Sequence, residues 1–187
     1  FLKELDFDGF GIGGSLGRTV TDCADVLKVI MPELPPEKPK HLLGLADYGT
    51  VHAGVKIGVD SFDSCFPTKL ARHGTAFVNN IKFNRNDIGN ENAVPCGLID
   101  AFNKLLKNSN VEWSSRIYLR SKKHLNDFSP IDSQCGCHTC RNYSRSYITH
   151  LLKQHEMIGL QLISIHNIYH TTQMLADMRN LILYDQL

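Results

Sequence analysis

Apolar residues at the start of the chain follow two periodicities, one typical of strands and one typical of helices. A short apolar run at residues 7–14 ends in paired glycines, as a buried strand does where its backbone approaches another group. Residues 20–31 then carry apolar side chains at helical spacing, and Thr19 with Asp22 predicts a capped helix start. Pro32 is expected to end this helix.

The same alternation continues to residue 62. Residues 41–45 predict a second strand, residues 50–57 a short helix and residues 59–62 a third strand. Short strand-helix-strand connections imply parallel pairing through right-handed crossovers, so we expect an α/β sheet or barrel. Three strands are too few to close a barrel, and any others would lie upstream of Phe1.

The rest of the chain has a different pattern. Residues 79–110 are rich in asparagine, with one apolar-striped helix predicted at 98–106. A basic, partly strand-like run at residues 113–124 suits either a solvated edge strand or a phosphate-contacting face. Two further helical stripes follow at residues 143–152 and 168–182, and the second is expected to pack on a sheet.

Composition narrows the classes of protein. At 187 residues and 42% hydrophobic content, the chain can bury one core plus a smaller subdomain. Its formal net charge of +1 means that any polyanion partner must bind a local patch. No apolar run reaches the ~18 residues of a membrane span and no signal peptide is evident, so we expect a cytoplasmic protein without a membrane partner. The chain begins at Phe1 rather than Met, which suggests a fragment.

Three cysteines within six residues indicate a metal site. Cys135, Cys137 and Cys140 are too close together to form disulfides easily, and His166 follows after 25 intervening residues. Three thiolates and one imidazole form a closed tetrahedral zinc site, which is structural rather than catalytic. His138 is the rival fourth ligand, but it lies between two ligands in sequence and would strain the turn. Free structural cysteines beside a core histidine are the alternative to Zn2+.

One carboxylate lies where parallel α/β folds carry their reactive groups. Asp63 directly follows the third predicted strand, and Lys69 and Arg72 follow within nine residues. This arrangement suggests an anionic or phosphorylated substrate beside a carboxylate. A helix cap or a loop-stabilising contact is the alternative role for Asp63.

These motifs together resemble one known family. Phe62-Asp63 with Pro67-Thr68, and the Cys-x-Cys-x-x-Cys run with its distant histidine, are similar to the tRNA-guanine transglycosylases, or queuine tRNA-ribosyltransferases. Shorter matches occur in the family's order along residues 7–78 and 115–187. They are Gly9–Gly14, Lys38-Pro39, Leu42–Gly44, Ser144–Tyr147 and His166–Ile168.

The resemblance implies the C-terminal part of a (β/α)8 barrel with an inserted zinc-binding subdomain. It divides the chain into barrel elements at 1–78, a family-atypical insert at 79–114, and the zinc subdomain with C-terminal helices at 115–187. The implied reaction replaces the wobble guanine of a tRNA anticodon loop with a 7-deazaguanine base, queuine or its precursor. A homodimer or heterodimer is implied as well. The isolated chain is expected to be inactive.

The resemblance also implies roles for single residues. Asp63 falls on the nucleophile that holds tRNA covalently, Gly13 and Gly14 on backbone near the base, and Leu43 on a position against the base ring. Lys69 and Arg72 fall on residues that bind RNA. The metal ligands would be Cys135, Cys137, Cys140 and His166.

The chain departs from the family pattern at several positions. Leu43 stands where methionine is usual, Ser64 where cysteine is usual, and Lys69 where arginine is usual. The loop after Gly14 is one residue shorter, and the family's base-recognising carboxylates and glutamine belong to its N-terminal half. Two alternatives stay open: a non-catalytic, zinc-stapled tRNA-binding or partner subunit, and the archaeal branch that modifies the D-loop.

Overall fold

The computed structural model describes residues 4–14, 16–17, 19–45, 47–79 and 114–183. The chain forms two compact units, Phe1–Phe66 and Pro67–Leu187. Nearly all of the proposed insert at 79–114, with its predicted helix at 98–106, lies outside the described residues.

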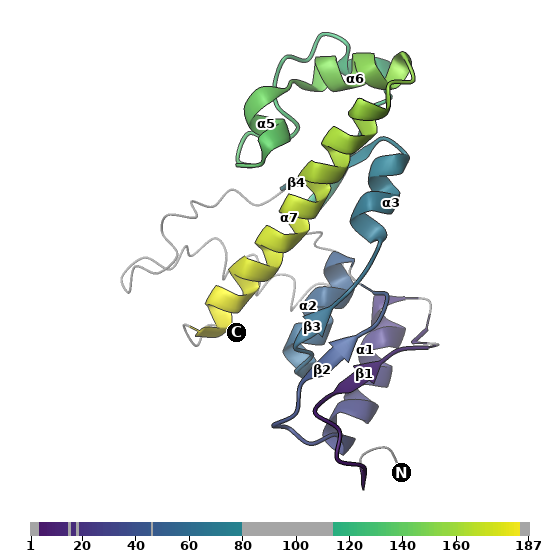
Figure 1. Cartoon of the computed structure of the whole chain (residues 1–187), viewed down its shortest axis with the longest axis vertical. Coiled ribbons are helices and arrows are strands. Elements are labelled where there is room, and N and C mark those ends of the chain that lie inside the picture. The colour runs from purple at the N-terminus through teal and green to yellow at the C-terminus, as the bar shows by residue number, and fades with distance from the viewer. Residues whose placement is uncertain (1–3, 15, 18, 46, 80–113, 184–187) are drawn as a thin grey trace. The chain divides into compact units, whose positions relative to one another are not determined.

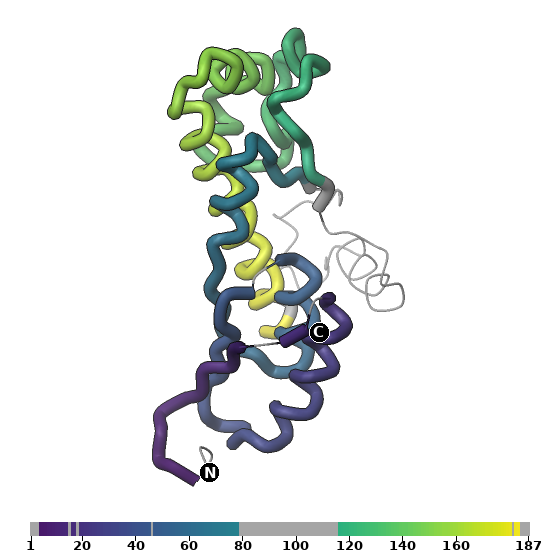
Figure 2. Tube along the Cα trace, turned by 90° about the vertical axis from the view of Figure 1, so that its right-hand side faces the viewer, coloured from purple at the N-terminus to yellow at the C-terminus, as the bar shows by residue number. Residues whose placement is uncertain are grey.

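The first unit is a parallel three-stranded sheet with its strands in chain order (Figure 1), and Figure 2 traces the same backbone from the side. β1 (Phe10–Ile12) pairs with β2 (Lys40–Leu42), which pairs in turn with β3 (Ser61–Phe62). Both pairings are parallel, as the sequence predicted. Both crossovers, from β1 to β2 and from β2 to β3, step in the same direction across the sheet. Right-handed connections therefore place both connecting helices on one face of the sheet.

Those two helices begin and end as local sequence signals predict. α1 (Val20–Ile30) starts at Thr19, whose hydroxyl accepts from the backbone N–H of Asp22 while the Asp22 carboxylate accepts from that of Thr19. The 3-10 helix η2 (Met31–Glu33) follows it. α2 (Tyr48–Ile57) ends at Gly58, whose left-handed φ of 96° suits glycine. The apolar core of the unit is formed by Ile12, Leu16, Cys23, Leu27, Leu42 and Val59.

The second unit combines a two-stranded antiparallel sheet with helices. α3 (Phe66–Arg72) leads into β4 (Thr75–Asn79), which pairs with β5 (Ser114–Tyr118). The basic, partly strand-like run predicted at 113–124 is thus a strand in its first part only, and the pattern gave no prediction of its partner β4. The 3-10 helix η4 (Lys122–His124) follows β5.

Three further helices complete this unit. They are α5 (His138–Asn142), α6 (Arg145–Lys153) and the long α7 (Met157–Leu183). α7 runs beside β4 (Figure 1) and both contribute to the second apolar core. The fully buried members of that core are Ala71, Ala76, Leu119, Ile131, Ile148 and Ile163.

The apolar stripe predicted on α7 is only partly right. Met178 is buried, but Ile168 and Ile182 are 47% and 52% exposed. The buried face instead carries polar side chains, among them His166, Asn167 and His170. His166 and Asn167 bond to backbone or to the cysteine cluster, and the ring of His170 lies against those of Phe77 and His166. A hydrophobic periodicity cannot reveal such contacts.

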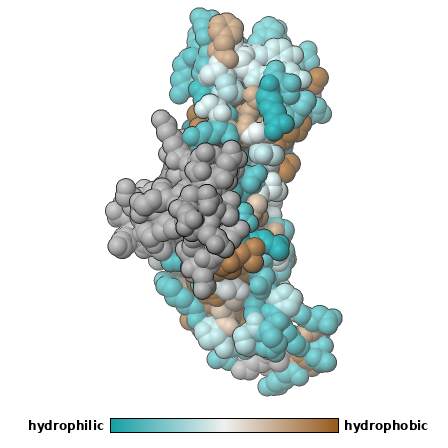
Figure 3. Space-filling view, turned by 90° about the vertical axis from the view of Figure 1, so that its left-hand side faces the viewer, coloured by the Kyte–Doolittle hydropathy of each residue, from teal (hydrophilic) through white to brown (hydrophobic). Residues whose placement is uncertain are grey.

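The surface in Figure 3 is mostly hydrophilic, with separate hydrophobic patches between the polar groups. Among the described residues, no helix is long and apolar enough to cross a membrane. Even α7, at 27 residues, interrupts its apolar positions with polar and charged ones.

Candidate active site and metal centre

The carboxyl ends of the three parallel strands bring the predicted substrate residues together. The strand register aligns Ile12, Leu42 and Phe62, so the residues that follow them, Gly13, Leu43 and Asp63, meet at one edge. The backbone N–H of Leu43 donates to the carbonyl of Ile12 over 2.8 Å, which continues the ladder one step beyond the strands. This is where parallel sheets carry their ligand-binding groups.

Gly13 and Leu43 are in direct contact. A Cβ atom added to Gly13 would lie 2.9 Å from Leu43 Cδ1, so any larger residue would displace that side chain. Gly14 has a φ of 95°, and a Cβ there would meet nothing within 4 Å. The Leu43 side chain is 49% exposed. The edge thus presents open backbone beside an accessible apolar side chain, which suits a planar ring.

The Asp63 carboxylate is held by two hydrogen bonds on one oxygen. The backbone N–H of Gly44 donates to Oδ1 over 3.2 Å, and His41 Nε2 lies 3.0 Å from the same atom. His41 Nδ1 in turn lies 2.8 Å from the hydroxyl of Ser61. Asp63 nevertheless remains open to solvent, because its side chain is 58% exposed.

The predicted RNA-binding cations lie on helix α3 and its surroundings. Lys69 and Arg72 are both exposed in the last turn of α3. In the basic run at 116–123, Lys122 and Lys123 are exposed as well. Arg120 is half-buried rather than exposed, and its guanidinium donates to the carbonyl of Leu152 over 3.3 Å. Arg120 therefore stabilises the second unit.

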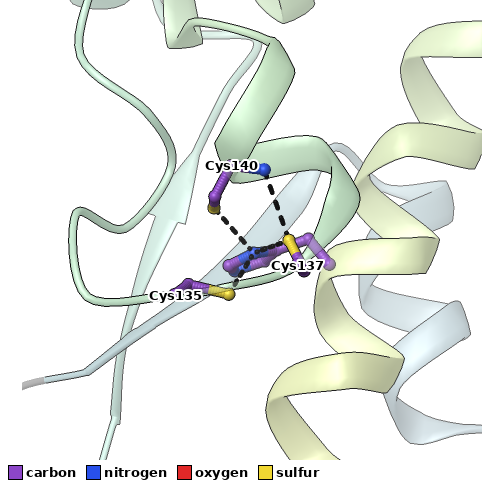
Figure 4. A group of neighbouring side chains, drawn as sticks. Cys135, Cys137 and Cys140 are labelled. Atoms are coloured by element: carbon purple, nitrogen blue, oxygen red, sulfur yellow. Dashed lines mark hydrogen bonds between the residues drawn. The ribbon is translucent and has the colours of Figure 1, made fainter.

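The second unit brings Cys135, Cys137, Cys140 and His166 together (Figure 4). Their ligand atoms all lie within 4.8 Å of one another, and His166 Nδ1 is 3.6, 3.5 and 3.3 Å from the three sulfurs in chain order. A tetrahedral zinc site with Zn–S of about 2.3 Å and Zn–N of about 2.05 Å has sulfur–nitrogen edges of about 3.6 Å. The group could therefore hold a metal ion of this size.

In the segment that carries the three cysteines, residues 135–140, the backbone bonds to sulfur. Cys137 precedes α5, and its sulfur accepts from the backbone N–H of Cys140 over 3.3 Å. The fourth ligand comes from the middle of α7. His166 is fully buried, and its Nε2 lies 2.8 Å from the carbonyl oxygen of Phe77 in β4. Since a carbonyl only accepts, Nε2 carries the hydrogen and Nδ1 offers its lone pair toward the thiols.

The electrostatics of the cluster are those of a site that binds a cation. Burial lowers the pKa of His166, but hydrogen bonds with Cys135 and Cys137 more than offset this and raise it to about 9. Hydrogen bonds from Cys135 and Cys140 to its sulfur lower the pKa of Cys137. Hydrogen bonds with Cys135 and Cys137 raise the pKa of Cys140, because the Cys140 thiol is the donor in them. The four groups thus lie close enough to shift one another's pKa, as ligands that converge on one cation do.

The rival ligand His138 lies outside this group. It is exposed, its Nδ1 is 3.3 Å from the side-chain amide of Asn142, and its ring packs edge-on against Tyr143. Its side chain lies on the first turn of α5 and is absent from the set of four converging ligand atoms.

Sequence reasoning missed three residues at these sites, namely His41, Ser61 and Asn167. A signal for the first two was present, because alternate residues of a strand point to one face. His41 and Ser61 each lie two positions before a strand-end residue of the site, Leu43 and Asp63. Asn167 carries no such signal, since its partners are 90 or more residues away.

The chain is thus an α/β protein with a carboxylate at the carboxyl end of its parallel strands. It also carries a separate Cys3His group that could hold a metal ion. A sequence model of one family, queuine tRNA-ribosyltransferase, matches residues 1–187. The chain belongs to the queuine tRNA-ribosyltransferase family. This agrees with the resemblance found in its motifs.

Individual relatives agree. A queuine tRNA-ribosyltransferase of Desulforamulus reducens is 34% identical over 187 residues, covering all of this chain and 41% of that protein. One of Chlamydia felis is 36% identical over 188 residues, again covering all of this chain and 41% of that protein. One of Prochlorococcus marinus is 36% identical over 171 residues, 91% of this chain and 37% of that protein. The chain thus spans about two fifths of the length of these curated relatives.

Proposed function

We propose that the protein to which this chain belongs exchanges a guanine base in tRNA for a 7-deazaguanine base. Family membership over the whole chain supports this reaction class. The observation that carries the proposal is the strand-end carboxylate Asp63, accessible to solvent and held by His41 and Gly44 beside Gly13 and Leu43.

Asp63 is the proposed nucleophile. One carboxylate oxygen forms a bond to the anomeric carbon of the ribose while the bond from that carbon to the guanine nitrogen breaks, and the base leaves with the electron pair and takes up a proton. The incoming base then loses a ring proton, its nitrogen rebuilds the glycosidic bond, and the carboxylate is released. Such covalent catalysis passes through an oxocarbenium-like transition state, as in retaining glycosidases.

The surroundings of Asp63 suit the base and the backbone of tRNA. Gly13 and Gly14 offer main chain that a planar base can approach closely, and Leu43 offers an apolar contact for its ring. Lys69 and Arg72 are exposed cations that follow Asp63 along the chain, and we assign them to the phosphates of the anticodon loop. The target guanosine must leave its stack to reach the carboxylate.

We assign Zn2+ to Cys135, Cys137, Cys140 and His166. Three thiolates and one imidazole are the ligand set that structural zinc prefers, and the sulfur–nitrogen distances match its tetrahedron. With all four positions taken by protein, zinc would have no open position for water, so it would stabilise the second unit rather than take part in the reaction.

We also propose that the first unit is part of a (β/α)8 barrel. The chain-order sheet β1-β2-β3, with parallel pairing throughout, is the arrangement of successive barrel units. Asp63 would then lie at the carboxyl-terminal face, where barrel enzymes place their reactive groups.

The test is the trapping of the covalent adduct by the full-length protein. Asp63→Asn keeps the shape of the side chain and removes its charge, so we expect no guanine exchange and no denaturant-resistant protein–tRNA adduct on a denaturing gel. Binding of tRNA should largely survive, because the phosphate contacts are unchanged.

A nearby carboxylate provides the matched control. Asp60 accepts from the backbone N–H of Lys40 over 2.8 Å, a contact that asparagine can also make. Asp60→Asn should therefore trap the adduct as the native protein does. An Asp63→Asn protein that still forms the adduct would show that another carboxylate is the nucleophile.

A further inference from the structure

A second titratable side chain lies at the strand-end site beside Asp63. We propose that His41, oriented by Ser61, is a positioning residue that fixes the Asp63 carboxylate for attack on the ribose. This inference rests on the proposed function of Asp63 as nucleophile, and it adds two residues to that site.

The strand register creates the arrangement. β2 and β3 place His41 and Ser61 side by side, and the next residue on the same face of β3 is Asp63. His41 Nδ1 lies 2.8 Å from Ser61 Oγ, and Nε2 lies 3.0 Å from Asp63 Oδ1. The imidazole thus spans the distance between the two side chains of one strand.

The chemistry of the three groups fixes where the protons lie. An ionised carboxylate only accepts, so Nε2 must carry a hydrogen to bond with Asp63. In the neutral imidazole Nδ1 is then an acceptor, and the Ser61 hydroxyl donates to it. Ser61 therefore selects the tautomer of His41 that can hold Asp63.

Both hydrogen bonds to the carboxylate end on Oδ1. Gly44 donates through its backbone and His41 through its ring, from two different directions. In the part of the chain that the structure describes, no hydrogen bond reaches Oδ2. Two donors on one oxygen fix the plane of the carboxylate and leave Oδ2 as the attacking atom.

The pair contributes more to orientation than to stability. The side chains of His41 and Asp63 are 38% and 58% exposed, and even a full ion pair in such surroundings would add little to folding. A misplaced nucleophile, by contrast, costs about 10²-fold in rate for a shift of about 1 Å. Loss of the His41 contact should therefore lower the rate of attack and leave the fold intact.

Two substitutions at His41 separate these effects in the full-length protein. Glutamine places an amide N–H near the position of Nε2, so His41→Gln keeps a donor for Asp63. Asparagine reaches only the position of Nδ1, so His41→Asn keeps a partner for Ser61 and loses the donor. We expect His41→Asn to lower kcat for guanine exchange about 10- to 100-fold, with KM for tRNA changed less than about twofold. His41→Gln should recover most of the rate.

Two further measurements test the positioning role: kcat of Ser61→Ala, and the rate at which His41→Asn forms the adduct. Ser61→Ala should lower kcat less than His41→Asn does, because the ring remains in place without its tautomer fixed. His41→Asn should reach the native amount of adduct more slowly, whereas Asp63→Asn forms none. If His41→Asn keeps kcat within about twofold of the native value, or His41→Gln is no better than His41→Asn, the positioning role is wrong while the role of Asp63 stands. If Asp63→Asn retains exchange, both proposals are overturned.

Discussion

Asn167 closes an edge of the second unit's sheet, and replacing it tests that role. Its Oδ1 accepts from the backbone N–H of Phe77 over 3.0 Å, and its Nδ2 donates to the carbonyls of Pro67 and Thr75, each over 3.0 Å. The neighbouring His166 donates to the carbonyl of Phe77. Two adjacent side chains of α7 therefore bond to both backbone groups of Phe77, as a further strand would.

Asn167→Leu keeps a similar volume and removes all three hydrogen bonds. The buried Phe77 N–H would lose its bond to Asn167, which costs about 1–3 kcal/mol, and two carbonyls would each lose one donor. We expect the free energy of unfolding to fall by about 2–4 kcal/mol. Asn167→Asp should be at least as damaging, because it keeps the acceptor but turns a carboxylate oxygen toward two carbonyl oxygens.

Urea-induced unfolding of the metal-loaded chain, followed by circular dichroism, measures the loss. Thr172→Ala is the matched control on the same helix, because Thr172 is exposed and its hydroxyl bonds only to α7 carbonyls. That change should stay within about 0.5 kcal/mol. An Asn167→Leu midpoint as close to the native value as that of Thr172→Ala would show that the edge of β4 does not depend on this amide.

Three further predictions follow from the remaining sites. Cys140→Ser should lose zinc measured by mass spectrometry, while His138→Ala should keep one zinc per chain; a His138→Ala protein without zinc would contradict the ligand assignment. Arg72→Ala in the full-length protein should reduce the salt slope of tRNA binding by about 0.7, and Lys28→Ala on α1 should not; equal slopes would remove Arg72 from the interface. Burial, and then Lys56, lower the pKa of His52 to about 4. As pH falls from about 6.5, the unfolded chain therefore gains a proton before the folded chain does. With the shift discounted for solvent screening, the free energy of unfolding should drop by about 1 kcal/mol by pH 4. His52→Gln should remove that part of the pH dependence of the urea midpoint, and an unchanged dependence would place it elsewhere.

The strand-end site could be predicted because each of its signals is local. The capping box at Thr19, the turn at Gly58 and the short apolar runs between them define strand-helix-strand units, and parallel pairing follows from short crossovers. Once the strands are parallel and in order, Gly13, Leu43 and Asp63 must meet at one edge. The four residues of the Cys3His group could be predicted in the same way, from ligand type and spacing.

What could not be predicted depends on contacts between distant segments. β4 pairs with β5 across 34 residues that separate Asn79 from Ser114, so no local pattern identifies it as a strand. The face of α7 that packs against β4 carries polar side chains such as His166 and Asn167 among its apolar ones. The apolar periodicity therefore pointed to Ile168 and Ile182, which are exposed. Buried polar groups are stable only with partners, and those partners are known only from the fold.

The two nitrogens of His166 connect the metal centre to the sheet of the second unit. Nδ1 faces three sulfurs, while Nε2 bonds to the same residue, Phe77, whose N–H is held by Asn167. Metal binding at Nδ1 would make the Nε2 hydrogen a stronger donor and tighten the contact with β4. The hydrogen bond from Nε2 to Phe77 orients the ring in the absence of metal as well. The ring is therefore preorganised by β4 for the cation, and the entropic cost of ordering this ligand falls on folding rather than on metal binding.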